Sequence, residues 1–452
     1  MVVYIHRKLY ISKFSIMRER EREREMFPNF WCNSLSPDHT SISAAFTISY
    51  EKFTVSSLSR SSEVRFRNLE KHNSKRERVE RRMGDQQHIA VRLMSRPVGM
   101  IVPGKDLVAK SEIRPGVHDV RDKQVLLHRL YLSLDPAMRG WMNDIPSYVP
   151  PVKIGAIMRG GSVNEVVYSR NSKFRVGDVV MDNGMNEGWS EYSISDGKAL
   201  ERIQVDLERL GLPLSACLGV LGGTGLTAYF GFLRVGRPKK GEVVLVSGAA
   251  GATGSVVCQI AKIYGCKVVG IAGGEAKCRW LKEELGLDDA IDYKSAKGDG
   301  KVFQKLLRAS LKRIGARSFD IFFDNVGGMI LNETLRRLSL RGRVVVCGAI
   351  SSYNAKDVRK DVMGIKNYQA LISLRARMEG FIVFDYRREY DAARKHLAQW
   401  IASGKLKFKE DVRDGLLNAP HALLDLFNGG NKGKLVVKVG DRVTSSEARS
   451  KL

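Results

Sequence analysis

Residues 243–262, VVLVSGAAGATGSVVCQIAK, decide the fold of this chain. The stretch begins with the β-branched residues Val243, Val244 and Val246, which are typical of a buried strand. A glycine-rich turn follows at once, and Ser255 opens an apolar pattern with the period of a helix. A strand, a glycine turn and a helix in this order present backbone N–H groups and a helix N-terminus to a diphosphate. The stretch therefore predicts a nucleotide-binding site.

Strand and helix patterns alternate on the C-terminal side of the first strand. Further strands are predicted at residues 267–272, 319–323 and 343–347, and helices are predicted to end at Tyr264 and Leu285. Alternating β and α units indicate an α/β fold with a doubly wound parallel sheet. We therefore expect residues 212–379 to form a Rossmann domain that binds the nucleotide.

Residues 83–211 instead show short strand patterns interrupted by glycine and proline. The predicted strands lie at residues 125–127, 163–168 and 174–180. Such spacing favours a β-rich, partly open barrel. Residues 380–440 are expected to return to this domain. They contain a predicted strand at 381–384, a helix at 389–403 and a strand at 434–439.

The composition limits the class of protein. The chain has 452 residues, enough for two or three domains, and its 43% hydrophobic content can fill a sizeable core. It contains no run of about eighteen apolar residues, so no membrane-spanning helix is predicted. The six cysteines have no paired CxxC spacing, which favours reduced thiols over disulfides or a zinc site.

The net charge of +26 is compatible with nucleic acid, a membrane surface or an anionic small molecule as a partner. The sequence has no zinc-finger pattern and no aromatic motif of the kind that binds RNA. A phosphate-bearing cofactor and a basic surface therefore explain the charge without a nucleic-acid or membrane partner.

The N-terminal segment, residues 1–82, differs in composition from the rest. It is rich in Ser, Arg and Lys, and residues 18–25 are a strict Arg-Glu alternation. The alternation fits a charged helix, or a (GA)n repeat of non-coding DNA that has been translated in error. In the second case Met83 is the true start. We expect residues 1–82 to be either disordered or absent from the natural protein.

The C-terminal segment, residues 441–452, is predicted to be a flexible tail. It ends in Ser450, Lys451 and Leu452, a tripeptide that the peroxisomal import receptor recognises. The expected location is therefore the peroxisome, with the cytoplasm as the alternative.

The residues around the glycine turn indicate which nucleotide binds. Gly251 allows the backbone to approach a diphosphate, and Gly254 allows the helix to pack on its strand. An NAD site has an acidic residue at the end of the second strand, where this chain has a glycine pair. Lys277 follows, and Tyr293 can add a hydroxyl donor, so NADP is favoured over NAD. The alternatives are an ordinary helix lysine and a packing tyrosine.

Six motifs in order resemble those of a known family. They are LDPAMRG at 134–140, GLTAY at 225–229, GAAGATG at 248–254, DNVGG at 324–328, CGAISSYN at 347–354 and RMEGF at 377–381. From about Met83 to Gly440 the chain resembles zinc-independent medium-chain dehydrogenases/reductases, specifically the prostaglandin reductase, alkenal double-bond reductase and curcumin reductase group. The resemblance implies a GroES-like catalytic domain beside the Rossmann domain, and a homodimer.

The resemblance also implies which residues contact NADP(H). They are Gly251, Ala252, Thr253, Gly254, Lys277, Tyr293, Asn325, Cys347, Gly348, Ala349, Ile350, Ser351, Ser352, Tyr353, Phe381, Ile382, Val383 and Asn431, with further contacts up to Arg387. Asn325 follows a predicted strand and can bond a ribose hydroxyl. Cys347 ends the next strand, beside the expected place of the nicotinamide.

The expected reaction follows from the residues that could or could not bind zinc. Zinc alcohol dehydrogenases need Cys and His ligands, yet no cysteine occurs between Met83 and Cys217, and no metal site is predicted. Without zinc, a carbonyl is harder to polarise for direct reduction. We therefore expect hydride transfer to the β-carbon of an enal or enone. Tyr368 is the first choice as hydroxyl donor to the developing enolate, with Tyr148 and Tyr353 as alternatives.

Two other functions remain open at this point. A quinone reductase could use the same site on quinones. A non-catalytic NADP-binding scaffold is also possible, since an intact nucleotide site does not prove turnover.

Overall fold

The computed structural model describes residues 86–184 and 188–443. Every element below lies within Arg67–Leu452. The predictions for residues 1–82 and for the tripeptide Ser450, Lys451 and Leu452 lie outside the described residues.

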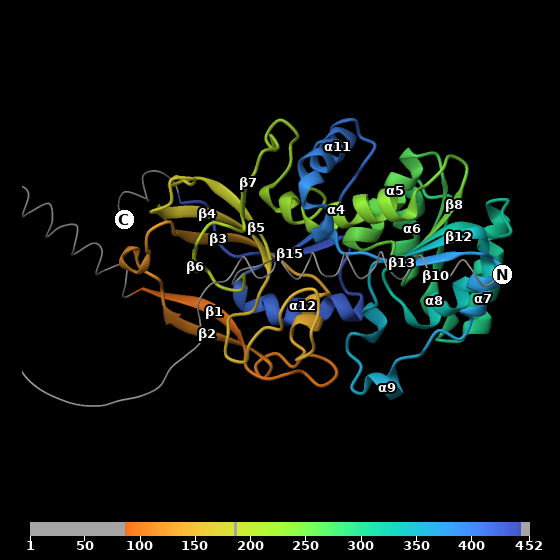
Figure 1. Ribbon diagram of the computed structural model, residues 1–452, viewed down its shortest axis with the longest axis horizontal. Helices are drawn as coiled ribbons and strands as arrows, with labels where there is room; N and C mark the ends of the chain where they lie inside the picture. The colour runs from red at the N-terminus through yellow and green to blue at the C-terminus, as the bar shows by residue number, and fades with distance from the viewer. Residues whose placement is uncertain (1–85, 185–187, 444–452) are drawn as a thin grey trace, which may run out of the picture. The chain divides into compact units, whose positions relative to one another are not determined.

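A six-stranded parallel sheet forms the nucleotide-binding half. Its strands lie in the order β10 (Asp289–Asp292), β9 (Lys267–Ala272), β8 (Val243–Ser247), β11 (Phe319–Asp324), β12 (Leu338–Val346) and β13 (Arg377–Gly380). Counted along the chain, this is the doubly wound order, with the third, second and first strands followed by the fourth, fifth and sixth. The Rossmann prediction is confirmed, and Figure 1 shows this sheet in green to blue.

Helices cover both faces of this sheet. The α-helices of both halves, among the described residues, are α3 (Met138–Trp141), α4 (Gly223–Phe230), α5 (Ala252–Ile263), α6 (Glu275–Glu283), α7 (Gly300–Arg313), α8 (Gly328–Thr334), α9 (Val358–Asp361), α10 (Gln369–Ser373), α11 (Tyr390–Ala402) and α12 (Ala419–Asn428). In β8, Val244 packs in one core with Ile260 of α5, whereas Leu245 packs in another with Phe303 of α7. Side chains alternate along a strand, so an apolar run such as 243–246 is buried on both faces.

A mixed sheet forms the other half. Its strands lie in the order β14 (Glu410–Asp414), β15 (Lys434–Lys438), β3 (Val125–Ser133), β4 (Gly161–Ser169), β5 (Val179–Asn183) and β7 (Leu200–Arg202), and β6 (Tyr192–Ser195) also pairs with β3. A separate hairpin contains β1 (Gln87–Leu93) and β2 (Leu107–Ile113). The β-rich catalytic domain of GroES-like type is confirmed.

The strand predicted at residues 381–384 is wrong. The last parallel strand is β13, whose Gly380 pairs with Val346 at the end of β12. After that pairing the chain leaves the sheet and forms the 3-10 helix η7 (Val383–Glu389). The apolar side chain of Phe381 packs against Phe323, so its hydrophobicity reflects burial rather than strand structure.

The chain returns to the mixed sheet later than the boundary predicted at residue 380. Leu397 of α11 and Leu406 belong to the same core as Val244 of β8. The first strand to rejoin the mixed sheet is β14, which pairs with β15. Apolar contacts therefore keep α11 with the nucleotide-binding half.

The described cysteines are free thiols, and all except Cys347 are buried. In the part of the chain that the structure describes, no helix is both long and apolar enough to cross a bilayer.

Candidate cofactor and substrate site

The strand order places a crevice at the carboxyl ends of β8 and β11. β8 ends at Ser247 and β11 at Asp324, and both side chains are fully buried. The Ser247 hydroxyl donates to the Asp324 carboxylate at 2.6 Å. The same carboxylate accepts the N–H groups of Val326 and Gly327, each at 3.0 Å. This network fixes the loop that follows β11.

Asn325 stands in the middle of this network. Its side-chain amide donates to the Ser247 carbonyl oxygen at 2.7 Å, and its backbone N–H donates to the Ser247 hydroxyl at 2.9 Å. Burial raises the pKa of Asp324, against the lowering effect of the Ser247 hydroxyl. The amide oxygen of Asn325 is then the atom that can accept a ribose hydroxyl.

The glycine turn between β8 and α5 has little room for side chains. Gly248 has a φ of +59°, and a Cβ on Gly254 would lie 2.3 Å from the Gly248 carbonyl oxygen. Gly251 is the N-cap of α5, and a Cβ there would meet that same oxygen at 3.2 Å. Ala252 and Thr253 complete the first turn of α5. The backbone of this turn forms a cradle that fits a diphosphate at a helix N-terminus.

A turn between α12 and β15 lies against the glycine turn. The Gly433 N–H donates to the Ala250 carbonyl oxygen at 3.1 Å, and Gly433 forms a bridge with Gly251. Asn431 is buried, and its amide donates to the Gly433 carbonyl oxygen at 3.0 Å. A Cβ on Gly433 would lie 2.1 Å from the Lys409 carbonyl oxygen, so glycine is required. The predicted Asn431 therefore lies beside the diphosphate cradle.

Cationic side chains gather where β9 ends. A Cβ on Gly273 would lie 2.9 Å from Cε of Lys294 and 3.0 Å from the ring of Tyr293. Burial lowers the pKa of Lys277, and the nearby ammonium groups of Lys294 and Lys432 lower it further. Lys277 is thus close to Lys294, the residue after Tyr293. Both predicted residues, Lys277 and Tyr293, lie where a 2′-phosphate is expected.

Carboxylates around these lysines have local partners. Asp292 accepts the N–H of Gly274 at 2.8 Å and the N–H of Lys294 at 3.0 Å. Glu275 pairs with Arg279 across one turn of α6, at 2.8 Å. An NAD site needs a carboxylate directed at the ribose hydroxyl, whereas these carboxylates bind backbone or arginine. The arrangement fits NADP.

The loop after β12 contains the predicted segment Cys347, Gly348, Ala349, Ile350, Ser351, Ser352 and Tyr353. The N–H groups of Cys347 and Gly348 donate to the Asp324 carbonyl oxygen at 2.9 Å and 3.1 Å. The Ala349 N–H donates to the hydroxyl oxygen of Tyr353 at 3.0 Å. Burial raises the pKa of Tyr353, so the hydroxyl keeps its hydrogen at neutral pH.

Cys347 is the first residue of this loop and is half-buried. Burial is the main cause that raises the pKa of its thiol to about 12, and the Asp324 carboxylate adds to it. The thiol is therefore neutral beside the expected place of the nicotinamide.

Tyr148 joins this group from the mixed-sheet half. The Trp141 indole N–H donates to the Tyr148 hydroxyl oxygen at 3.2 Å, and the tyrosine ring packs edge-on against Phe384. Burial is the main cause that raises the pKa of Tyr148, with Cys347 as a lesser one, and Tyr148 in turn raises the pKa of Tyr353. Tyr148 is nevertheless 48% exposed, so a ligand can reach it. The structure thus brings two of the predicted tyrosines together.

Tyr368 lies elsewhere. It is the residue before α10, and its side chain is 56% exposed. Its neighbour Asn367 is bound to Asn332 of α8. Tyr368 is not among the groups that shift the pKa of Tyr148 or Tyr353. Its choice as first donor stays a prediction.

The segment after β13 is used mainly for packing. A Cβ on Gly231 would lie 2.2 Å from the ring of Phe381, which shows how closely that ring is packed. The Val383 carbonyl oxygen accepts the Tyr390 hydroxyl at 3.0 Å, and Arg387 lies 4.8 Å over the ring of Phe384. The contacts of Phe381, Ile382 and Val383 with a cofactor stay a prediction.

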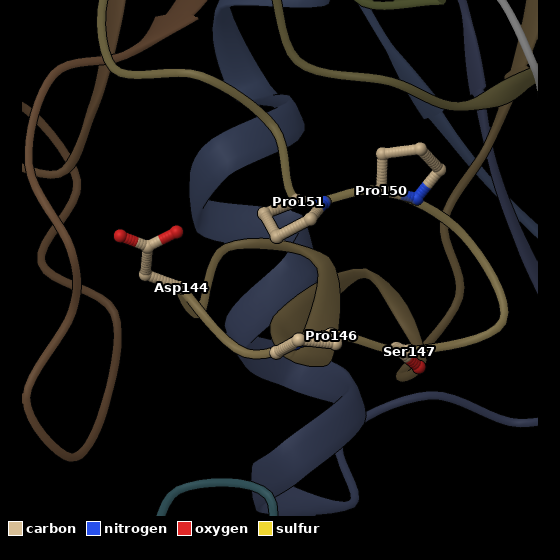
Figure 2. A pocket seen from close by; sticks show the side chains of 5 residues that line it. All are labelled: Asp144, Pro146, Ser147, Pro150 and Pro151. Carbon is tan, nitrogen blue, oxygen red and sulfur yellow. The ribbon is translucent and has the colours of Figure 1, made fainter.

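A pocket of about 400 Å³ lies in the loop that contains Tyr148. It is lined by Asp144, Pro146, Ser147, Pro150 and Pro151. Figure 2 shows this loop curling in front of a helix, with the prolines on both sides of the pocket. Because proline fixes φ, the wall of the pocket is stiff.

Sequence reasoning missed Ser247, Asp324 and Trp141 as parts of this site. Ser247 ends a predicted strand and Asp324 directly follows one, and a polar residue at the carboxyl end of a buried parallel strand is a usable signal. Nothing in the sequence pairs Trp141 with Tyr148. Within residues 86–184 and 188–443, no group of three or more His, Cys, Asp or Glu side chains is placed to hold a metal ion.

Two family descriptions match the chain. They are an N-terminal domain of oxidoreductase at residues 90–203 and a zinc-binding dehydrogenase at residues 252–399.

Individual proteins match over most of their length. A protein of Bacillus subtilis (strain 168) named as an NADP-dependent oxidoreductase is 45% identical over 325 residues, which cover 72% of this chain and 91% of that protein. The 2-alkenal reductase (NADP(+)-dependent) of Nicotiana tabacum is 42% identical over 337 residues, which cover 74% and 91%. The crystal structure of CurA from Vibrio vulnificus in complex with NADPH is 38% identical, with a TM-score of 0.70, and covers 78% of this chain and 100% of that one.

Proposed function

This chain belongs to the zinc-independent group of the medium-chain dehydrogenases/reductases, and we propose that it reduces the C=C bond of α,β-unsaturated aldehydes and ketones with NADPH. The name of the tobacco relative supports this substrate class, and the NADPH-bound neighbour supports the cofactor. Quinone reduction and a non-catalytic scaffold are not favoured.

The cofactor placement is part of the proposal. The cradle formed by Gly251, Ala252, Thr253 and Gly254 would hold the diphosphate, because its closely packed backbone leads directly into the N-terminus of α5. Lys277 and Tyr293 would bind the 2′-phosphate, and Asn325 and Asn431 would bind the sugar and diphosphate. The loop that starts at Cys347 would then lie beside the nicotinamide.

The observation that carries the proposal is the orientation and protonation of two tyrosine hydroxyl groups. The hydroxyl oxygen of Tyr148 accepts the Trp141 indole N–H, and that of Tyr353 accepts the Ala349 N–H. Each hydroxyl is therefore oriented by a donor and keeps its own hydrogen, which the raised pKa also favours. Two oriented O–H donors in a half-buried site suit an oxygen that becomes an enolate.

NADPH, once bound, would supply a hydride for the β-carbon of the substrate, with the electron pair of the C=C bond moving toward the carbonyl oxygen. Tyr353 and Tyr148 donate hydrogen bonds to that oxygen as its negative charge develops. The α-carbon then takes a proton from solvent or from a tyrosine hydroxyl. Tyr368 is the alternative hydrogen-bond donor to this oxygen. To act in this way, its exposed segment must approach the substrate.

We also propose a homodimer, and a peroxisomal location directed by Ser450, Lys451 and Leu452, with the cytoplasm as the alternative. Sedimentation at micromolar concentration tests the dimer. Imaging of the chain with and without its last three residues tests the location, because identical distributions would exclude a role for the tripeptide.

A substrate panel tests the proposed reaction. Enals, enones and quinones are supplied with NADPH or NADH, and products are identified by mass spectrometry and NMR. We expect saturated aldehydes and ketones, with NADPH preferred. Allylic alcohols would show attack at the carbonyl carbon instead, and turnover confined to quinones would favour the quinone reductase alternative. NADPH binding without turnover of any substrate would favour the non-catalytic scaffold.

A further inference from the structure

The turn between α12 and β15 contains a lysine, Lys432, that no step above has used. Lys432 is half-buried, and its ammonium nitrogen lies 5.4 Å from the centre of the Trp280 ring. Trp280 follows Lys277 by three residues on α6, so both side chains lie on one face of that helix. A cation held over an aromatic ring has a preferred position. Lys432 is therefore held near Lys277.

Backbone contacts fix the turn on both sides of Lys432. The Lys277 ammonium donates to the Gly429 carbonyl oxygen at 2.9 Å. Gly429 has a φ of +70° and ends α12, which turns this part of the chain toward α6. On the other side, Gly433 is bonded to the Ala250 carbonyl oxygen of the diphosphate cradle. Lys432 thus stands between the proposed 2′-phosphate and diphosphate positions.

Three ammonium groups meet at this place. Lys294 and Lys432 both act on Lys277, although like charges raise the free energy of the folded protein when they approach. The nearby Asp292 accepts backbone N–H groups, and Glu275 is paired with Arg279. An anion bound between the lysines would attract each ammonium group and so offset their mutual repulsion.

We propose that the ammonium group of Lys432 is a further ligand of the 2′-phosphate of NADPH, together with Lys277 and Lys294. This inference rests on the proposed placement of the 2′-phosphate beside Lys277 and Tyr293. It makes Lys432 a specificity-determining residue that arrives from the α12–β15 turn rather than from the Rossmann motif.

The proposal also gives the turn a second role. Lys434, two residues after Lys432, is buried in the mixed-sheet half. Its ammonium group donates to the Leu134 carbonyl oxygen and to the Asp135 carboxylate, each at 2.8 Å. A 2′-phosphate bound to Lys432 would therefore hold the turn between the cofactor and the segment that leads to α3. Hydrogen exchange of residues 430–434 should slow more with a 2′-phosphorylated nucleotide than without the extra phosphate.

The test measures binding of adenosine 2′,5′-bisphosphate and of adenosine 5′-monophosphate to the full chain by calorimetry. We expect Lys432→Met to lower the preference for the bisphosphate about tenfold, the usual worth of one charge-assisted contact at a partly exposed site. Binding of the monophosphate should stay unchanged, and Lys432→Arg should restore the preference. Lys282→Met is the control for a general loss of charge, since Lys282 is an exposed lysine on α6, the helix that contains Lys277.

Three outcomes would overturn the proposal. One is a normal preference in Lys432→Met while Lys277→Met loses it, which would leave the proposed cofactor placement intact. Another is a normal preference in both variants, which would also remove the 2′-phosphate from this place. The third is equal loss in Lys432→Met and Lys282→Met, which would indicate a general effect of charge. Because no substrate is involved, failure of the proposed reductase activity would be seen separately in the panel.

Discussion

The two ends of the proposed cofactor site are built in different ways. The diphosphate end is made by backbone, through residues 248–254, which are continuous in sequence. The nicotinamide end is made by side chains that are far apart in sequence, with Tyr148 from one half and Tyr353 from the other. The first end tolerates almost no added atom, whereas the second depends on how two halves of the chain meet. Cofactor binding and catalysis should therefore respond to different substitutions.

The largest effect is expected at the diphosphate end. Gly254→Ala would place a Cβ 2.3 Å from the Gly248 carbonyl oxygen, so α5 must move away from its strand. We expect NADPH binding to weaken about a hundredfold or more, consistent with about 3 kcal/mol of overpacking. Gly223→Ala in α4 is the control, because a Cβ there meets nothing within 4 Å among the described residues. Equal affinity in the two variants, measured by fluorescence titration, would contradict the role of this turn.

The next effect concerns the thiol at the nicotinamide end. With its pKa raised from 9.0 to about 12, Cys347 holds about a thousandfold less thiolate at pH 8 than an ordinary cysteine. Its alkylation by iodoacetamide should be slower by that factor and should accelerate as pH rises toward 12. Peptide mass spectrometry measures the rate against the unfolded chain, and Cys347→Ser identifies the signal. Equal rates in folded and unfolded protein would show that the pKa is not raised.

A smaller loss is expected from the tyrosines. Tyr148→Phe and Tyr353→Phe each remove one O–H donor, and each should lower kcat about tenfold to a hundredfold while NADPH binding is retained. The double variant should lose more than the product of the two effects, because each single variant keeps one hydroxyl that partly replaces the other. Single-turnover kinetics with an enal measures this. Unchanged kcat in both variants and in Tyr368→Phe would exclude a tyrosine donor.

The smallest effect is expected at Trp141, a positioning residue. Trp141→Phe removes the indole N–H that orients the Tyr148 hydroxyl, and one hydrogen bond of this kind corresponds to about a threefold to tenfold change. The loss should appear in kcat rather than in KM. It should also vanish in a Tyr148→Phe background, where there is no hydroxyl to orient. An equal loss in both backgrounds would show that Trp141 acts through packing alone.

Much of the nucleotide-binding half could be predicted from sequence. The strands β8 and β9 have the predicted bounds, because Val- and Ile-rich runs between glycine turns give a local signal. β10 was not predicted, since Asp289–Asp292 is short and carries two acids. Phe381 was misread as a strand residue because a buried apolar side chain looks alike in a strand and in a packed loop.

By itself, the sequence determined the diphosphate cradle and the cofactor class, because a strand, a glycine turn and a helix are contiguous and their geometry is local. Only the tertiary structure decided that Tyr148 lies near enough to Tyr353 to raise its pKa, that the Ser247 hydroxyl binds Asp324, and that Lys432 lies near Lys277. These contacts join residues that lie 77 or more positions apart. Their formation depends on the packing of whole elements, which no local pattern of residue types records.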